Sequence, residues 1–204
     1  VQQMGNFQFR EGDRQASATQ ADYASEAQIL TLAGSPLLWD SQTRTRADRI
    51  FFNLRADTAE GVGKVQSTHF GNGGRSQADW RGEPINVLAD RVVAQRESEL
   101  VHYEGNVRVW HGQDVVESSS LDVYRKERRV GSGFRVLTSH LQPASRLAGQ
   151  DSTASATSEK RPVTIRADRL EYFDEGRKAS YRGNVQLRAE NTTLQAERID
   201  VYFL

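Results

Sequence analysis

The chain has 204 residues, 27 Lys and Arg residues balanced by 27 Asp and Glu residues, and no cysteine. Zero net charge argues against a binder of nucleic acid or another polyanion. The missing cysteine excludes disulfides, thiolate metal sites and cysteine catalysis. Because only 37% of the residues are hydrophobic, we expect a thin core or an elongated molecule with much surface per residue.

No stretch of the sequence predicts a transmembrane helix. The longest uncharged stretch, 27–39, is interrupted by Gly34 and Pro36 and is shorter than the roughly 20 apolar residues that a span needs. No signal peptide is recognisable, and a first residue Val1 is expected of a processed or engineered chain.

Internal repetition is the strongest signal in the sequence. Residues 166–188 align without a gap with residues 88–110, and both segments contain Ala-Asp-Arg followed by Tyr-x-Gly-Asn-Val. A small residue recurs at steps of 29, with two longer steps of 42 and 49, and most of these anchors are followed after 16 residues by a glycine. The anchors are Ala18, Ala47, Ala89, Ser118, Ala167 and Ala196, and the following positions are Gly34, Gly63, Gly105, Phe134 and Gly183.

Apolar residues near these anchors alternate with a period of two, which predicts strands with one buried face and one exposed face. The apolar parity changes within each Ala-Asp-Arg motif, as between Ala167 and Leu170, and this change predicts a bulge or corner. The recurring glycine predicts a bend in the following strand. Each repeat is therefore expected to contain two strands of roughly 7–10 residues joined by a polar turn.

The repeat organises residues 1–204 into a single elongated domain. We expect a first repeat pair at 18–69, a second at 87–141 and a third at 162–204. Segments 70–86 and 142–161 interrupt the repeat and are predicted to be inserted loops, the second of them mobile and rich in Ser, Ala and Thr. The first 17 residues are expected to form a frayed partial strand, and the last repeat has its first strand alone.

Several of these segments resemble a known family. The two Tyr-x-Gly-Asn-Val pentapeptides, 103–107 and 181–185, and the segments 167–172 and 194–203 resemble the signature of the lipopolysaccharide-transport periplasmic bridge family. This family is also called the organic-solvent-tolerance, or LptA/OstA-like, domain. The last repeat pair follows the signature nearly throughout and the second follows it well. The first pair is a looser match, because Gly-Ser-Pro replaces Gly-Asn-Val at Gly34.

The resemblance implies a fold, an activity and a location. The fold is an all-β, elongated antiparallel β jelly roll, V-shaped and open along one side like a folded taco, built here from about six 29-residue two-strand repeats. The activity is non-enzymatic: the acyl chains of lipopolysaccharide or a related lipid lie in an apolar crease, and the lipid is carried towards the outer membrane. The location is the periplasm of a diderm bacterium. Other jelly-roll members of the transport bridge are the implied partners, stacked end to end, and a homo-oligomer also remains open.

The alternation of apolar residues is consistent with such a crease. Two facing apolar sheets form a core where they meet and a groove about 10 Å wide where they splay, and each buried CH₂ group of an acyl chain contributes roughly 0.8 kcal/mol. We expect some inward residues to line a groove and others to pack its closed end. The inward residues predicted to bind lipid are Leu38, Ile50, Phe52, Val92, Tyr103, Val107, Val109, Leu121, Val123, Leu170, Tyr172, Val185, Leu187, Ile199 and Val201, and the same parity includes Leu32, Val65, Val136, Tyr181 and Phe203.

The polar residues form no recognisable catalytic or metal-binding motif. The Asp-Arg pairs of the three Ala-Asp-Arg motifs are expected at solvated corners, and a row of phosphate-binding arginines is the alternative. His69 and His140 occupy equivalent places in the repeat, but no two histidines have the spacing of metal ligands. We therefore predict no catalytic residue, no metal and no cofactor.

Two other interpretations of the repeat stay open. A carbohydrate-active or adhesive β-solenoid would wind the same period into parallel rungs, although Trp39, Trp80 and Trp110 do not share a repeat position, as an aromatic platform requires. A purely structural assembly module is the other possibility. The last strand, 199–203, is expected at a sheet edge, where free N–H and C=O groups are available to another chain.

Overall fold

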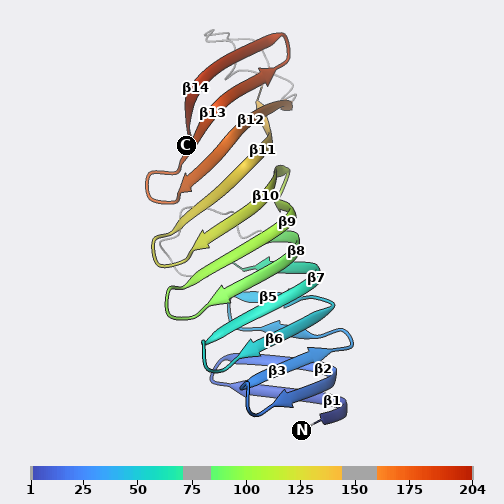
Figure 1. The fold of residues 1–204 in the computed structure, drawn as a ribbon. Coiled ribbons are helices and arrows are strands. Elements are labelled where there is room, and N and C mark those ends of the chain that lie inside the picture. The colour runs from blue at the N-terminus through green and yellow to red at the C-terminus, as the bar shows by residue number, and fades with distance from the viewer. Residues whose placement is uncertain (1, 71–83, 144–159, 204) are drawn as a thin grey trace.

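The computed structural model describes residues 2–70, 84–143 and 160–203 of the chain. All regular elements in these ranges are strands, and they form one antiparallel sheet. The strands lie across the long axis of the molecule and follow one another along it, from β1 at one end to β14 at the other (Figure 1). The strands are β1 (Gln2–Glu11), β2 (Arg14–Ala24), β3 (Ile29–Ala33), β4 (Leu37–Trp39), β5 (Thr43–Arg46), β6 (Arg49–Asn53), β7 (Thr58–His69), β8 (Ile85–Gln95), β9 (Leu100–His111), β10 (Asp114–Tyr124), β11 (Arg129–Pro143), β12 (Lys160–Phe173), β13 (Lys178–Ala189) and β14 (Thr192–Tyr202).

Two positions in the sheet are filled by interrupted strands. Both β3 and β4 pair with β2, so they are the two halves of one broken strand. The next position is shared by β5 and β6, which pair with β4 and β3 on one side and with β7 on the other. Pro36 lies in the first break and lacks the backbone N–H that a continuous ladder needs. Antiparallel pairing throughout the described sheet contradicts the parallel-solenoid interpretation.

The strands bend at the corners that the repeat predicts. Gly105 and Asn106 in β9 have φ angles of 76° and 47°, and Gly183 and Asn184 in β13 have φ angles of 77° and 48°. The pairing of β13 with β14 shifts register between Arg182 and Val185, as expected of a bulge. Two successive residues in the left-handed region thus turn the strand sharply.

The corners at Gly63, Gly105 and Gly183 are each completed by the aspartate of an Ala-Asp-Arg motif. Asn106 donates from Nδ2 to Oδ2 of Asp90 at 2.8 Å, and Asn184 makes the same bond to Asp168 at 2.8 Å. A Cβ atom added to Gly105 would lie 2.4 Å from Oδ2 of Asp90. The motif therefore requires glycine both for its backbone conformation and for the space that the aspartate fills.

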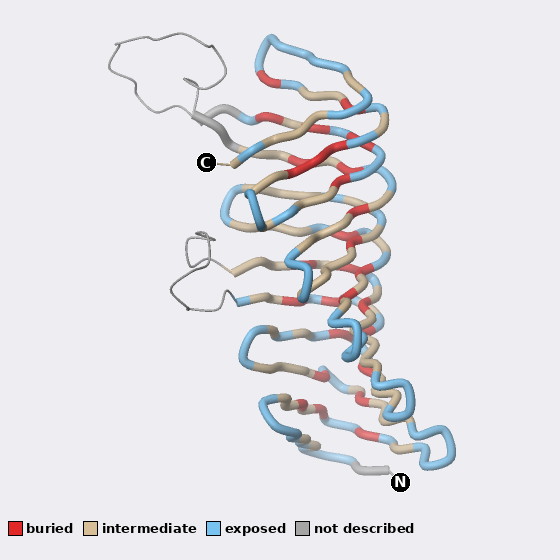
Figure 2. Tube along the Cα trace, turned by 90° about the vertical axis from the view of Figure 1, so that its left-hand side faces the viewer, coloured by how far each residue is buried: buried red, intermediate tan, exposed pale blue. Residues whose placement is uncertain are grey.

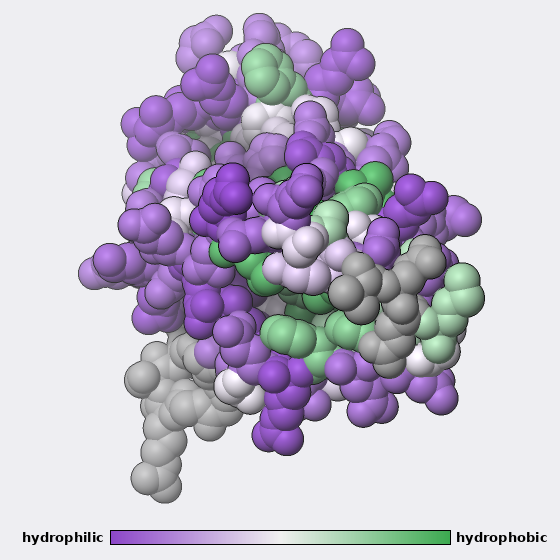
Figure 3. All heavy atoms as spheres, turned by 60° about the horizontal axis from the view of Figure 1, so that its bottom comes forward, coloured by the Kyte–Doolittle hydropathy of each residue, from purple (hydrophilic) through white to green (hydrophobic). Residues whose placement is uncertain are grey.

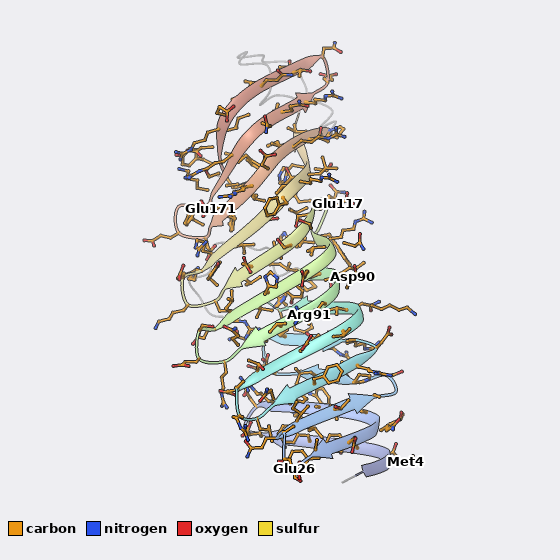
Figure 4. The ribbon with its side chains drawn as sticks, viewed as in Figure 1. Met4, Glu26, Asp90, Arg91, Glu117 and Glu171 are labelled. Atoms are coloured by element: carbon orange, nitrogen blue, oxygen red, sulfur yellow. The ribbon has the colours of Figure 1, made fainter. Side chains whose placement is uncertain are left out.

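The arginine that follows the aspartate has a separate role. Arg91 lies on the outer surface beside Asp90 (Figure 4) and pairs with Glu60 at 2.6 Å and Glu104 at 3.2 Å on the two neighbouring strands. This arrangement is the expected solvated corner. Because these contacts engage the Arg91 guanidinium with carboxylates, Arg91 does not support the alternative of a phosphate-binding row.

The fourth corner departs from the motif. Phe134 and Arg135 of β11 have φ angles of 57° and 58°, although neither is glycine or asparagine. Ser119, in the place of the aspartate, donates from its hydroxyl to the carbonyl oxygens of Gly133 and Phe134, both at 3.1 Å. The Phe134 ring is 72% exposed, so it gains little from packing in return for this unfavourable backbone conformation.

The N-terminal residues form a complete hairpin, so the prediction of a frayed partial strand is wrong. Strand β1 pairs with β2 from Gln2 to Glu11, and the register shifts between Met4 and Phe7. Gly5 and Asn6 have φ angles of 85° and 43°, which makes this the same corner as at Gly105. The sequence carries the signal for this corner as Gly-Asn-Phe at residues 5–7.

Most residues of the two predicted loops lie outside the described residues. The prediction that the second loop is mobile concerns these residues as well. Phe70 and Pro84 lie outside the strands, and the other described residues of the two segments belong to strands, since β8 begins at Ile85, β11 ends at Pro143 and β12 begins at Lys160.

Buried side chains recur at similar places in successive strands (Figure 2). They form two clusters along the sheet. The first runs from β2 to β10 and includes Leu32 and Tyr103, and the second runs from β11 to β13 and includes Val136 and Tyr181. The core is thin, as the composition predicts, because each strand contributes few buried residues.

Candidate functional site

A single continuous groove follows the length of the sheet. It has a volume of about 2330 Å³, and every strand from β1 to β14 contributes to its lining. The view towards the N-terminal end shows hydrophobic residues gathered in a hollow, between outer surfaces that are mostly hydrophilic (Figure 3). The inner surface of the bent sheet therefore does not close into a core along its whole width.

Most of the residues predicted to face inward line this groove. They come from strands on both sides of the sheet's midpoint and include small aliphatic and aromatic side chains. The predicted residues found in the lining are Leu38, Ile50, Phe52, Val92, Tyr103, Val109, Leu121, Val123, Leu170 and Tyr172, together with Tyr181 and Phe203.

The other inward residues pack below or beside the groove. Val107 and Val185 are 2% and 1% exposed and lie next to the corners, in the closed crease. Leu187, Ile199 and Val201 pack against the second core cluster. The remaining inward residues, Leu32, Val65 and Val136, are also buried. The expected division between lining and packing residues is thus present, but the parity of the sequence does not tell the two groups apart.

Further lining residues lie at the N-terminal end and were not among those predicted. Phe7 and Phe9 of β1 line the groove, and the Phe9 ring lies 6.3 Å from the Phe52 ring. Their alternation after Gly5-Asn6 is the signal that could have identified them. Leu30 and Ile85 also belong to the lining and share the inward parity of their strands.

Polar groups interrupt the apolar lining at Tyr103. The Tyr103 hydroxyl lies 2.8 Å from Nε2 of His69, and Nδ1 of His69 lies 3.3 Å from the Thr43 hydroxyl. The pKa of His69 is lowered to about 4, chiefly by burial. The positive charge of Arg125 also lowers this pKa, and its effect is larger than the opposing effect of Asp40. Burial also raises the pKa of Tyr103 to about 12. Both groups are therefore neutral at physiological pH.

A second cluster of the same kind surrounds Tyr181. Its hydroxyl lies 3.1 Å from the Thr138 hydroxyl and 3.2 Å from Nε2 of His140. Nδ1 of His140 lies 3.3 Å from a carboxylate oxygen of Asp114. Burial raises the pKa of Tyr181 to about 12. The equivalence of His69 and His140 in the repeat is thus explained, since each contacts the buried tyrosine of a Tyr-x-Gly-Asn-Val motif.

Five four-residue turns form one rim of the groove, at 25–28, 54–57, 96–99, 125–128 and 174–177. A backbone hydrogen bond joins each turn to the next, as from the Arg96 N–H to the Asp57 carbonyl and from the Arg125 N–H to the Glu99 carbonyl. Charged first and last residues of several turns, among them Arg96, Arg125 and Arg128, face the groove. The rim is therefore polar although the interior is apolar.

The described ranges contain no cluster of three His, Asp or Glu residues that could hold a metal ion. They also contain no helix long and apolar enough to cross a membrane.

Comparisons with known proteins agree with the resemblance seen in the sequence. Residues 164–203 match the family model of the LptA/(LptD N-terminal domain) LPS transport protein. No curated protein sequence matches the chain. The match confirms the predicted resemblance to the lipopolysaccharide-transport family over these residues, which form most of the last repeat pair.

The fold is similar to that of a solved structure. That structure is the crystal structure of LptH, described as the LptA homologous periplasmic component of the conserved lipopolysaccharide transport device from Pseudomonas aeruginosa. The TM-score is 0.51 at 9% sequence identity, over 73% of this chain and 92% of the LptH chain. This similarity confirms the predicted elongated β jelly-roll fold.

Proposed function

We propose that this protein is a non-enzymatic carrier or bridge for lipopolysaccharide in the periplasm, and that the acyl chains of the lipid lie in the groove. The observation that carries this proposal is the continuity of the groove, which has apolar lining residues from Phe7 in β1 to Phe203 after β14. The periplasmic location is the one described for LptH.

The physical argument rests on the contrast between interior and rim. Each CH₂ group moved from water into an apolar groove contributes roughly 0.8 kcal/mol, so long acyl chains need no dedicated binding motif. The charged turns at the rim, such as 96–99 and 125–128, favour a solvated headgroup outside. A lipid with several chains and a large polar headgroup fits both requirements.

Native mass spectrometry tests this proposal. Protein purified without detergent and mixed with lipopolysaccharide should carry lipid at a defined stoichiometry, and adding excess free lipid A should displace it. A protein that retains no lipid but still assembles end to end would favour the purely structural module instead.

The two terminal strands support assembly into a longer bridge. Among the described strands, β1 pairs with β2 alone and β14 with β13 alone, so these two are the edge strands of the described sheet. An edge to which a second jelly roll adds its own edge would extend the groove as well as the sheet. We propose contacts of this kind with other members of the bridge or with a second copy of the chain.

The pairing of β14 identifies the residues to change at this edge. The Phe203 N–H donates to the Arg177 carbonyl of the neighbouring strand's turn, and N–H directions alternate along a strand. The N–H of Val201 therefore points towards β13, whereas the N–H of Tyr202 points to the free edge. Tyr202→Pro should suppress concentration-dependent assembly in light scattering and leave the monomer folded, and Tyr202→Ala is the matched control. Equal assembly of both variants would contradict the edge contact.

A further inference from the structure

Arg125 reaches across the groove. It is the first residue of the turn between β10 and β11, and Nη2 donates to the Thr43 hydroxyl at 2.9 Å. Thr43 begins β5, and it lies 82 residues earlier in the chain. Both side chains belong to the groove lining. The contact thus joins the rim turns to the strand ends on the opposite side of the groove.

The charge of Arg125 is less compensated than that of Arg96 and Arg128 on the same rim. Arg96 pairs with Asp57 at 3.7 Å, and Arg128 pairs with Asp174. Arg125 forms no ion pair with another described residue, and the partner it does have is a neutral hydroxyl. The guanidinium nevertheless acts electrostatically on the groove interior, because its positive charge lowers the pKa of His69 despite the presence of Asp40.

The hydrogen bonds around Thr43 determine which hydrogen-bond donors a ligand would meet there. In the tautomer that carries its proton on Nδ1, neutral His69 accepts a hydrogen bond from the Tyr103 hydroxyl at Nε2 and donates one from Nδ1 to the Thr43 hydroxyl. Thr43 Oγ1 also accepts from Arg125. Its lone pairs are then engaged, and its hydroxyl proton remains to be donated. An incoming anion would meet two donors, the Arg125 guanidinium and the Thr43 hydroxyl.

We propose that Arg125 and Thr43 form the site that receives a phosphate group of the bound lipid, whose acyl chains occupy the apolar groove beside it. This inference rests on the proposed function and adds the chemical class of the ligand headgroup. Guanidinium binds phosphate with paired N–H donors, and such charge-assisted bonds are stronger than the bond to a neutral hydroxyl. Arg125 therefore exchanges its contact with the Thr43 oxygen for the phosphate, while Thr43 becomes a second donor to it.

Binding of two lipids tests this assignment. The probes are bisphosphorylated lipid A and the same lipid after removal of its phosphates, each titrated onto the detergent-free protein and followed by native mass spectrometry. Wild type should bind the bisphosphorylated lipid about tenfold tighter or more, as expected for a charged hydrogen-bonded pair. Arg125→Gln should bring the two affinities together, chiefly by weakening binding of the bisphosphorylated lipid.

The control is Lys126→Gln, which removes one positive charge from the same turn at an exposed position outside the groove lining. It should keep the preference of wild type for the phosphorylated lipid. If Arg125→Gln also keeps that preference, the site is wrong. If wild type binds both lipids equally, the inference fails while lipid carriage stands. If wild type binds neither lipid, the proposed function fails with it.

Inorganic phosphate is the third probe, because the same donors could hold a free anion. The assignment to a lipid headgroup predicts that millimolar inorganic phosphate neither adds mass to the protein nor competes with bisphosphorylated lipid A. Competition that disappears in Arg125→Gln would overturn the assignment in favour of a free-anion site.

Discussion

The region around Tyr103 and the region around Tyr181 repeat one buried hydrogen bond and differ in the charged group beside it. In the first region, the hydrogen bond joins Tyr103 and His69, and the guanidinium of Arg125 donates to the same Thr43 hydroxyl that His69 contacts. In the second region, the bond joins Tyr181 and His140, and the nearby charged group is the carboxylate of Asp114. The repeat thus preserves the contacts that hold the sheet together, while the charge facing the groove differs.

This difference follows from where each residue lies. The tyrosines are 1% exposed and sit two residues before a corner whose geometry is the same in both regions. Arg125 and Asp114, in contrast, lie at opposite ends of β10, next to turns that tolerate many side chains. A repeated fold can therefore keep its buried pattern and still vary the electrostatics of its groove along the axis.

The largest expected effect comes from the corner that both regions share. Gly105→Ala would place a Cβ atom 2.4 Å from Asp90 at a φ of 76°, and we expect a loss of about 2–4 kcal/mol in the free energy of unfolding. The matched control is Gly133→Ala, since Gly133 has no positive φ and its nearest contact to an added Cβ would be Ser120 Oγ at 3.5 Å. Urea denaturation of the two variants measures the difference, and equal losses would contradict this account of the corner.

The next effect is the pH dependence of stability that the burial of His69 causes. His69 has a pKa of about 4 in the folded protein against 6.5 in the unfolded chain, so the unfolded state binds more protons between these values. Stability should therefore fall as pH drops from 6.5 to 4, by up to about 3 kcal/mol at 1.36 kcal/mol per pKa unit. His69→Gln should remove this part of the pH dependence.

Asp200 affects the free energy of unfolding in a different pH range. Hydrogen bonds from Arg198 and then Lys178 hold the pKa of its carboxyl well below the usual value of 3.8, so its contribution is lost at lower pH than that of His69. A wild-type stability curve that stays flat between pH 6.5 and 4 would contradict the neutral, buried state of His69.

A smaller effect on stability is expected at the two buried tyrosines, and it should be similar for both. Tyr103→Phe removes the hydroxyl that contacts His69, and Tyr181→Phe removes the one that contacts His140 and Thr138. Each change leaves a polar group without its partner, and we expect a loss of about 1–3 kcal/mol in either region. Thermal unfolding measures both. A loss in one variant with none in the other would show that the two clusters are not equivalent.

The smallest effect is a gain in stability at the irregular fourth corner. Phe134→Gly relieves a φ of 57° at a side chain that is 72% exposed. The relief exceeds the entropy cost of glycine, so we expect a gain of about 0.5–1 kcal/mol. Phe134→Ala keeps the strained conformation and should show no such gain. A lower melting temperature for Phe134→Gly would indicate that the exposed ring makes a contact that stabilises the fold.

Much of the fold could be predicted from the sequence because each strand occupies a fixed position within the repeat. Period-two alternation predicted the strands, and the change of parity at Ala-Asp-Arg predicted the corners. The N-terminal hairpin was not predicted, because Gly5-Asn6 was not recognised as the corner dipeptide of a repeat.

The candidate site was less predictable. Alternation gives the inward parity but not the depth, so Val107 and Phe52 look alike in sequence although one is buried in the crease and the other lines the groove. The contact of Arg125 with Thr43 depends on how far the bent sheet opens, because it joins residues 82 positions apart that belong to different repeats. No local sequence pattern predicts how far the sheet opens.

The central claim, that lipid occupies the groove, is tested most directly by adjacent aromatic residues on opposite faces. Phe52 and Tyr172 line the groove, whereas their neighbours Phe51 and Phe173 lie outside the lining. A photo-crosslinking phenylalanine analogue at each of the four positions would be irradiated in the presence of lipopolysaccharide, and adducts would be detected by immunoblotting. We predict strong adducts at Phe52 and Tyr172 and little at Phe51 and Phe173. Equal labelling of both faces, or labelling confined to the outer pair, would contradict the account.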